Sequence, residues 1–182
     1  MNQAFRPLAV VIASALTALS ADAADLHAFV AKTSNASTLS FLNPANAKQI
    51  SGKSLNFAAE TGAVYSNDGT VAYLFPAPPN STKLYAYNIA TGNAVGSVTF
   101  PNNIGQVVTT PLSSNLFVST YNQQQTEIYQ VNTSTFTATK VYTGSRSGPM
   151  AVSPDGGTLY LVTNATQFVP GNTLLFLSTT TL

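Results

Sequence analysis

The chain has no cysteine and no tryptophan, a single histidine, and only 7% charged residues. The absence of cysteine excludes disulfides, thiolate metal sites and cysteine nucleophiles. The formal net charge is +1, so the chain lacks the basic excess with which proteins neutralise phosphates, and we expect no nucleic-acid partner. Disordered chains are poor in apolar residues, whereas 45% of these 182 residues are hydrophobic. The sequence therefore predicts a folded domain with a packed core.

The first 23 residues have the layout of a secretory signal peptide. Arg6 precedes an apolar run at 8–19, and small residues follow up to a cleavage position after Ala23. An uncleaved anchor is the less favoured alternative, because the run is too short to cross about 30 Å of hydrocarbon as a helix. We expect residues 24–182 to form a secreted mature chain without a transmembrane segment, in the periplasm or at the cell surface.

Apolar segments with a central aromatic residue recur at a nearly constant spacing after the signal peptide. The aromatic residues are 44, 44 and 43 positions apart and are Phe29, Tyr73, Phe117 and Tyr160. A second series of segments, ending at positions 43, 88, 132 and 178, has steps of 45, 44 and 46. Two series with one period indicate an internal repeat. The approximate repeats are 24–57, 58–101, 102–144 and 145–182.

Each repeat contains signals for four strands and none for a helix. In the third strand, the apolar positions 39, 84, 128 and 174 lie three residues before the apolar positions 42, 87, 131 and 177. Residues three apart in a strand point to opposite faces, so both faces must be covered. Blades of a β-propeller are covered on both faces by their neighbours, whereas a sandwich leaves one face in water. The predicted fold is all-β, a β-propeller of four-stranded antiparallel blades with about four repeats present.

Two turns between the first and second strands of a repeat carry Asp followed by Gly. They are Asp68-Gly69 and Asp155-Gly156. The Asp side chain accepts hydrogen bonds from the turn backbone, and Gly adopts the positive φ that such turns require. We assign these four residues a structural role in the turns. A calcium site is the less favoured alternative for the two aspartates.

The segment AVSPDGGTLY at 151–160, with Thr-Asn following at 163–164, resembles the YVTN-type β-propeller repeat. Another element of that repeat is similar to AYNIATG at 86–92. The resemblance covers most of 24–182, although the third repeat has Pro-Leu-Ser at 111–113 where Pro-Asp-Gly is expected. It implies a secreted or surface propeller. Similar repeats occur in surface proteins, in haem-binding and quinoprotein-like propellers, and in lactonase-like enzymes.

The repeats at the two ends of the mature chain each lack one strand. The first repeat begins at its second strand, and the last stops before its fourth, which leaves about fourteen strands. We therefore expect a partial propeller, the N-terminal part of a longer protein. A closed four-bladed ring and an oligomer that completes the ring are the alternatives. Self-association through the open blade edges is the corresponding prediction about partners.

No catalytic residues, metal ligands or cofactor are predicted. Arg146 lies in the loop GSRSGP at 144–149 and is the candidate for contact with an anionic ligand, because such loops can reach the central funnel of a propeller. The alternative is that Arg146 is a solvent-exposed loop residue without a role in binding. His27 is the only histidine, and without nearby partners we favour a structural role over haem or metal ligation. The carboxylates are scattered, with no paired arrangement for acid–base catalysis.

Three functions are compatible with this sequence. The first is a non-catalytic extracytoplasmic propeller that acts as a binding or scaffold module for a protein or a small-molecule ligand. The second is part of a lactonase-like or quinoprotein/haem-type propeller enzyme whose active residues lie in blades outside this chain. The third is a surface-layer or adhesion structural protein. We favour the first, because the signal peptide and the repeat are accompanied by no acid–base or metal constellation.

Overall fold

The computed structural model describes residues 27–32, 36–43, 48–58, 61–76, 81–111, 113–122, 125–145, 147–163 and 173–180. For the first three strands it describes the backbone only. Within these ranges every regular element is a β-strand, and the fourteen strands form four antiparallel sheets. These ranges contain no helix that is long and apolar enough to span a membrane.

The strands follow one another in sequence order within each sheet. The first sheet contains β1 (His27–Lys32), β2 (Ala36–Asn43) and β3 (Lys48–Ala58). The second contains β4 (Thr61–Tyr65), β5 (Val71–Pro76), β6 (Lys83–Asn88) and β7 (Ala94–Thr99). The third contains β8 (Asn103–Thr109), β9 (Asn115–Tyr121), β10 (Gln125–Asn132) and β11 (Thr137–Ser145). The fourth contains β12 (Ser147–Val152), β13 (Thr158–Thr163) and β14 (Thr173–Ser178).

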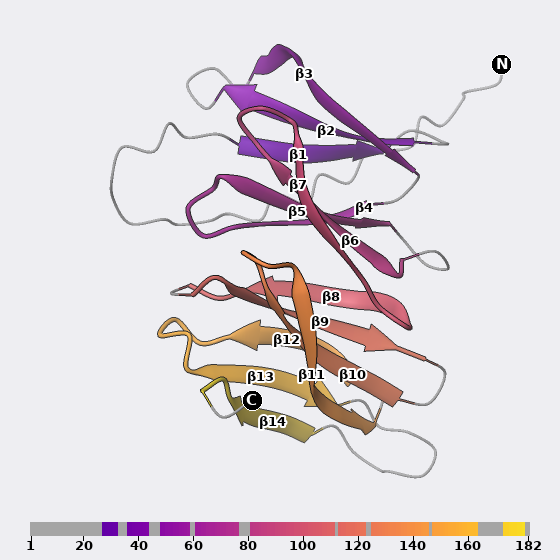
Figure 1. The fold of residues 1–182 in the computed structure, drawn as a ribbon, viewed down its shortest axis with the longest axis vertical. Helices are drawn as coiled ribbons and strands as arrows, with labels where there is room; N and C mark the ends of the chain where they lie inside the picture. The colour runs from indigo at the N-terminus through magenta and orange to yellow at the C-terminus, as the bar shows by residue number, and fades with distance from the viewer. Residues whose placement is uncertain are drawn as a thin grey trace, which may run out of the picture.

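The four sheets are stacked face to face in chain order, from the indigo sheet at one end to the yellow sheet at the other (Figure 1). The backbones of neighbouring sheets approach one another most closely at their first strands. Thus β1 contacts β4, and β8 contacts both β4 and β12. This arrangement places β4, β8 and β12 together along one side of the stack, and β7 and β11 at the outer edges of their sheets.

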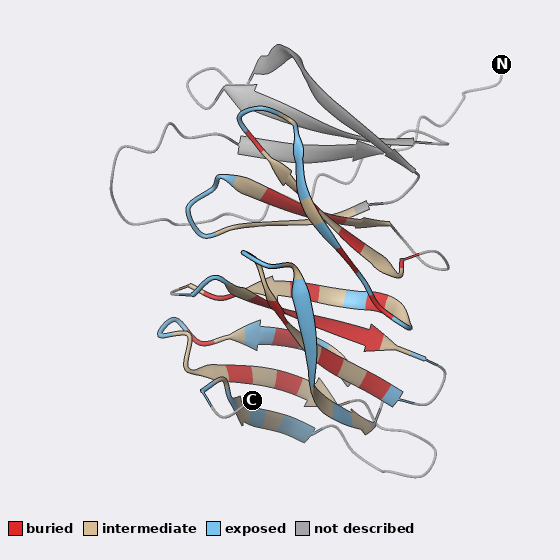
Figure 2. Ribbon diagram, in the orientation of Figure 1, coloured by how far each residue is buried: buried red, intermediate tan, exposed pale blue. Residues whose placement is uncertain are grey.

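Two hydrophobic cores fill the spaces on either side of the third sheet. Val131 belongs to the core shared with the second sheet, and Ile128 belongs to the core shared with the fourth. The prediction that these two positions of one strand point to opposite faces is thereby confirmed. Strand β9 is buried on both faces, because its central residues alternate between the two cores. Buried residues run along the middle strands, whereas β14 has none (Figure 2).

The turns between strands depend on residues with positive φ. Gly69, Gly92 and Gly156 have φ angles of 69°, 73° and 71°. Phe136 occupies the position 44 residues after Gly92 and has a φ of 54°, which is unusual for a bulky residue. Its ring packs onto the second sheet directly over Gly96, where an added Cβ atom would overlap it. The contact with Gly96 stabilises Phe136 in a positive-φ conformation that is occupied by glycine at the other three described positions.

Candidate functional site

The turn between β4 and β5 is closed by the carboxylate of Asp68. Its Oδ1 atom accepts hydrogen bonds from the Ser66 hydroxyl at 2.6 Å, from the Thr70 amide at 3.0 Å and from the Thr70 hydroxyl at 2.9 Å. The Gly69 amide donates to the Ser66 carbonyl at 2.9 Å. These hydrogen bonds, all from groups within the turn, organise it.

The turn between β12 and β13 has the same network. Asp155 Oδ1 accepts hydrogen bonds from the Ser153 hydroxyl and, at 2.9 Å, from the Gly157 amide. The Gly156 amide donates to the Ser153 carbonyl at 2.8 Å. These hydroxyl and amide donors lower the pKa of the Asp155 carboxyl below its ordinary value. The four turn residues singled out in the sequence thus lie in two equivalent turns.

A groove of about 440 Å³ lies beside the Asp68 turn, between the second and third sheets. Two hydrogen bonds cross or border it. Asn67 Nδ2 donates to the Pro111 carbonyl at 2.5 Å, and Thr133 Oγ1 donates to the Ser114 carbonyl at 2.6 Å. Most lining residues carry hydroxyl or amide groups, and they are Ser66, Asn67, Asp68, Thr70, Val71, Tyr73, Thr109, Thr110, Pro111, Ser113, Ser114, Asn115 and Thr133.

Asp68 is the carboxylate of this groove. The Ser66 hydroxyl, followed by the Thr70 amide, lowers the pKa of Asp68 below its ordinary value. The side chain is therefore ionised at neutral pH and accepts hydrogen bonds from its own turn. A carboxylate held in this way is a poor proton acceptor, since general bases work best with a pKa near the operating pH. The groove thus presents one ionised carboxylate among neutral hydroxyl and amide groups.

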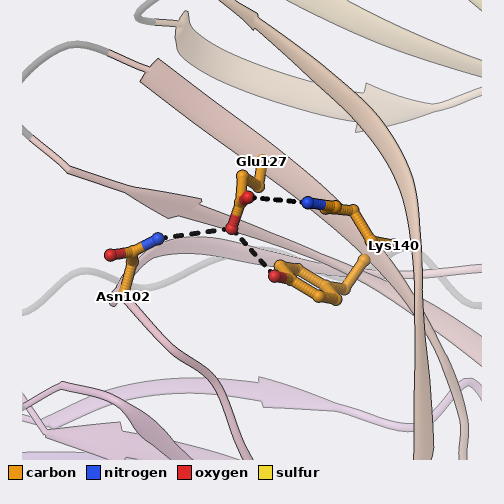
Figure 3. Close-up of polar contacts among 4 residues, drawn as sticks. Asn102, Glu127 and Lys140 are labelled. Atoms are coloured by element: carbon orange, nitrogen blue, oxygen red, sulfur yellow. Dashed lines mark hydrogen bonds and ion pairs between the residues drawn. The ribbon is translucent and has the colours of Figure 1, made fainter.

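A second polar cluster surrounds Glu127 on β10 (Figure 3). Its Oε1 atom pairs with the Lys140 ammonium of β11 at 3.0 Å. Its Oε2 atom accepts hydrogen bonds from the Tyr129 hydroxyl at 2.8 Å and from Asn102 Nδ2 at 3.2 Å. Asn102 lies in the connection between β7 and β8. The Tyr129 ring also packs edge-on against Phe100, with 5.2 Å between centroids. The cluster therefore ties the third sheet to the segment that arrives from the second.

The contacts within this cluster favour an ionised Glu127 and a neutral Tyr129. The Lys140 hydrogen bond, followed by that of Tyr129, lowers the pKa of Glu127. Burial, followed by the hydrogen bond to Glu127, raises the pKa of Tyr129 to about 12. The Glu127 side chain is 15% exposed, and both of its oxygens have donors. We interpret the role of the cluster as structural: its polar groups bind one another and hold the β7–β8 connection against the third sheet.

Gln106 of β8 holds the third and fourth sheets together. Its amide nitrogen donates to the Met150 carbonyl at 2.9 Å, and its amide oxygen accepts from the Met150 amide at 2.7 Å. Pairing of β12 with β13 is irregular between Ser147 and Met150. Gln106 and Met150 are 44 residues apart, as are Asn67 and Pro111. Sequence reasoning missed both contacts, and the repeat gave no signal for them.

The other residues that the sequence singled out do not gather at one site among the described residues. Arg146 lies outside the described residues. His27 is the first residue of β1, where only the backbone is described. Of the two turn aspartates, Asp68 lines the groove and Asp155 does not. Within the described part of the chain, no three His, Cys, Asp or Glu side chains gather where they could hold a metal ion.

No family model matches the chain, and no curated protein matches it. Among solved structures, hydrazine synthase of Kuenenia stuttgartiensis is similar, with a TM-score of 0.64 and 16% identity over 79% of this chain and 40% of that one. A chain of the mitotic checkpoint complex has a TM-score of 0.58 and 16% identity, over 84% of this chain and 47% of that one. Both structures contain propellers. The fold is β-propeller-like.

The four stacked sheets are accordingly named blades 1 to 4 in chain order. This chain spans less than half the length of either structural neighbour, at 40% and 47%. The groove and the Glu127 cluster both lie where blades 2 and 3 meet. The groove is at the ends of β8 and β10, and the cluster is near the beginnings of these strands. Of the two, the groove is the one open to a ligand.

Proposed function

We propose that this chain is a secreted, non-catalytic β-propeller that acts as a binding or scaffold module at the cell surface or in the periplasm. The groove between blades 2 and 3 is the observation that carries this proposal. It offers one fixed carboxylate among neutral hydroxyl and amide groups. Such a lining recognises neutral ligands rich in hydroxyl or amide groups, such as an oligosaccharide or a polar peptide segment.

We further propose that the chain belongs to the YVTN-type repeat family and forms part of a larger propeller ring. The serine–aspartate–glycine turns of blades 2 and 4 share one hydrogen-bond network, as expected for units of the YVTN type. Four blades that span less than half of their structural neighbours, 40% and 47% of them, favour a partial propeller over a complete ring. In this proposal the four blades present a recognition surface and rely on further blades to close the ring.

The groove is tested with a ligand screen on the purified protein, in which backbone chemical shifts are followed during titration with neutral oligosaccharides and short polar peptides. A ligand that binds here perturbs the amides of the β4–β5 and β8–β9 turns. Ser114→Trp fills the groove and is expected to weaken binding at least about tenfold. Ser97→Trp, the same change at an exposed position of β7, is the matched control and leaves binding intact. Binding that survives Ser114→Trp contradicts the assignment of the groove.

The location is tested separately on the natively produced protein. Sequencing of the mature N-terminus is expected to give Ala24 as the first residue, and the protein is expected in the periplasmic or extracellular fraction. A retained Met1, with the protein in the cytoplasmic fraction, contradicts secretion but leaves the groove assignment untouched.

A further inference from the structure

The hydroxyl groups that line the groove between blades 2 and 3 donate their protons mainly to other groups of the protein. In the β4–β5 turn, the Ser66 and Thr70 hydroxyls both donate to Asp68 Oδ1, at 2.6 and 2.9 Å. On the other side of the groove, the Thr133 hydroxyl donates to the Ser114 carbonyl at 2.6 Å. Since a hydroxyl group has one proton, these three groups can offer a ligand only their lone pairs.

The turn between β8 and β9 uses its hydroxyl protons in the same way. The Thr110 hydroxyl donates to the Asn115 carbonyl at 2.6 Å, because a carbonyl can only accept. The Thr110 proton is thereby engaged, so the 2.6 Å contact between the Thr110 and Ser113 hydroxyls has Ser113 as its donor. Five of the seven serine and threonine hydroxyls of the lining therefore donate to the protein itself.

The groups that remain available to a ligand are mainly acceptors. Among the residues that the structure describes, every donor to the Asp68 carboxylate reaches Oδ1, so Oδ2 is available. Asn67 Nδ2 donates to the Pro111 carbonyl, which leaves the side-chain oxygen of Asn67 as an acceptor. The carbonyls of Pro111 and Ser114 accept one side-chain hydrogen bond each and retain a second lone pair. Donors to a ligand are fewer and come from residues such as Ser114 and Asn115.

This combination does not recur at the junction of blades 3 and 4. The residue 44 positions after Asp68 is Leu112, which has no carboxylate. The residue 44 positions after Asn67 is Pro111, which has no side-chain donor to reach the following turn. Of the two junctions, only the one between blades 2 and 3 therefore pairs a turn carboxylate with a bridging amide.

An acceptor-rich groove selects ligands by the donors that they carry. Each hydroxyl of a saccharide can rotate to donate to whichever acceptor it meets. An extended peptide presents a carbonyl beside every amide, so part of its polar backbone faces acceptors and loses its hydrogen bonds to water without replacement. An acidic ligand is repelled by Asp68, because the described lining holds no lysine, arginine or histidine. Neutral saccharides meet all three conditions.

We propose that the groove between blades 2 and 3 binds a neutral oligosaccharide, with one sugar hydroxyl donating to Asp68 Oδ2 and others donating to carbonyls of the β8–β9 turn. This inference rests on the proposed binding function of the groove and names its ligand class. It separates the two kinds of neutral ligand that the lining admits, saccharide and polar peptide, in favour of the saccharide.

The substitution Asp68→Asn tests the carboxylate while keeping the turn. The asparagine oxygen can replace Oδ1, since Asn88 Oδ1 accepts both the amide and the hydroxyl of Thr91 in the turn after β6, at 2.9 and 3.1 Å. The asparagine NH2 group replaces the acceptor Oδ2 with a donor, and we expect about tenfold weaker binding of the saccharide. Asp155→Asn is the matched control. It makes the same change in the equivalent turn of blade 4, which does not line the groove, and should leave binding unchanged.

The ligand class is tested by calorimetric titration of the full chain with neutral hexasaccharides of glucose, mannose, galactose and N-acetylglucosamine. Hexagalacturonate and a hexapeptide of alternating serine and asparagine are the acidic and peptide probes. We expect at least one neutral hexasaccharide to bind and to shift the amide signals of the β4–β5 and β8–β9 turns. The acidic and peptide probes should bind at least about tenfold more weakly, because they mismatch the acceptors of the groove.

The outcomes separate this inference from the binding function itself. If the peptide or hexagalacturonate binds best, or if saccharide binding is unchanged in Asp68→Asn, the saccharide assignment is overturned. The groove then still stands as a binding site, provided that Ser114→Trp weakens binding of the same probe. If no probe binds, or if binding survives Ser114→Trp, both proposals are overturned. Circular dichroism checks the fold of Asp68→Asn, and if this variant does not fold, the comparison of probes on the unmodified protein still decides.

Discussion

At the scale of single residues, the polar side chains of this protein are satisfied mainly by their own neighbours. Asp68 and Asp155 accept hydrogen bonds within their turns, and Asn132 accepts from the amides of Ser134 and Thr135 at 2.9 and 3.0 Å. The neutral side chain of Asn132 thus accepts hydrogen bonds from turn amides as the carboxylates of Asp68 and Asp155 do. This explains how the chain organises repeated turns with only 7% charged residues.

Titration of tyrosine tests the Glu127 cluster. Burial raises the pKa of Tyr65 and that of Tyr129 to about 12, so both are expected to ionise late among the eight tyrosines. Glu127→Gln removes the negative charge that opposes ionisation of Tyr129, and the pKa of Tyr129 is expected to fall while that of Tyr65 stays. Near-ultraviolet absorbance during an alkaline titration measures this, and Tyr129→Phe identifies the signal. An unchanged late phase in Glu127→Gln contradicts the close contact between the Glu127 carboxylate and the Tyr129 hydroxyl.

The same pKa shifts predict how stability depends on pH. The folded-state pKa of Tyr129 is about 12 and its ordinary value is 10.0, so the unfolded chain loses this proton first as the pH rises. The contribution of Tyr129 to stability is therefore complete below pH 10.0 and is lost between 10.0 and about 12. Urea unfolding of the unmodified protein and of Tyr129→Phe measures it. The difference between them is expected to diminish across this range.

At the scale of elements, blades are joined by side chains that differ from one repeat to the next. Gln106 bonds both backbone groups of Met150, whereas the equivalent position in blade 2 is Gly62. Gly62 is packed against the Phe75 ring, where an added Cβ atom would overlap it. The same repeat position is thus a glutamine that bonds the next blade in blade 3 and a glycine without a side chain in blade 2.

Gln106→Leu tests the contribution of this contact. The substitution leaves the amide and the carbonyl of Met150 without their partner, and we expect a loss of about 1–3 kcal/mol in the free energy of unfolding. Gln106→Glu retains an acceptor for the amide but has no donor for the carbonyl when ionised, so it should also destabilise. Gln125→Leu, an exposed amide on β10, is the control and should change stability little. Equal stabilities for Gln106→Leu and Gln125→Leu argue against the contact.

The pair of Gly96 and Phe136 gives a prediction about two elements in contact. Gly96→Ala pushes a methyl group into the Phe136 ring, and we expect overpacking to cost about 1–3 kcal/mol. Phe136→Gly relieves the positive φ but removes the ring from the core. Because the clash needs both side chains, Gly96→Ala should cost much less in the Phe136→Gly background. A double-mutant cycle from urea unfolding measures this coupling, and additive effects contradict the contact.

The regular part of this structure could be predicted from the sequence, and the irregular part could not. The aromatic spacing located the strands, and the positions of Ile128 and Val131 predicted a strand covered on both faces. The contacts of Gln106 and Asn67 were missed because they join backbone groups of the next repeat, which have no sequence signature. The groove was missed for the same reason, since it forms between two turns that are 44 residues apart.

At the scale of the whole molecule, the described strands form a stack in which the main contacts between blades join neighbours, as in a one-dimensional array. Blade 3 is the shared member, because both hydrophobic cores include residues of its strands. The two cores do not share a residue, so damage to one should spread toward one end of the stack only. Strand β10 allows this to be tested with two substitutions three residues apart.

Ile128→Ala and Val131→Ala should loosen opposite ends of the stack. Ile128 is fully buried against blade 4, and Val131 is 1% exposed against blade 2. Ile128→Ala is expected to cost about 2–5 kcal/mol, and Val131→Ala less, because it removes fewer carbon atoms. Amide hydrogen exchange should accelerate in β13 and β14 for Ile128→Ala, and in β5 and β6 for Val131→Ala. If both variants accelerate exchange in the same strands, the blades unfold as one cooperative unit and the two cores are not independent.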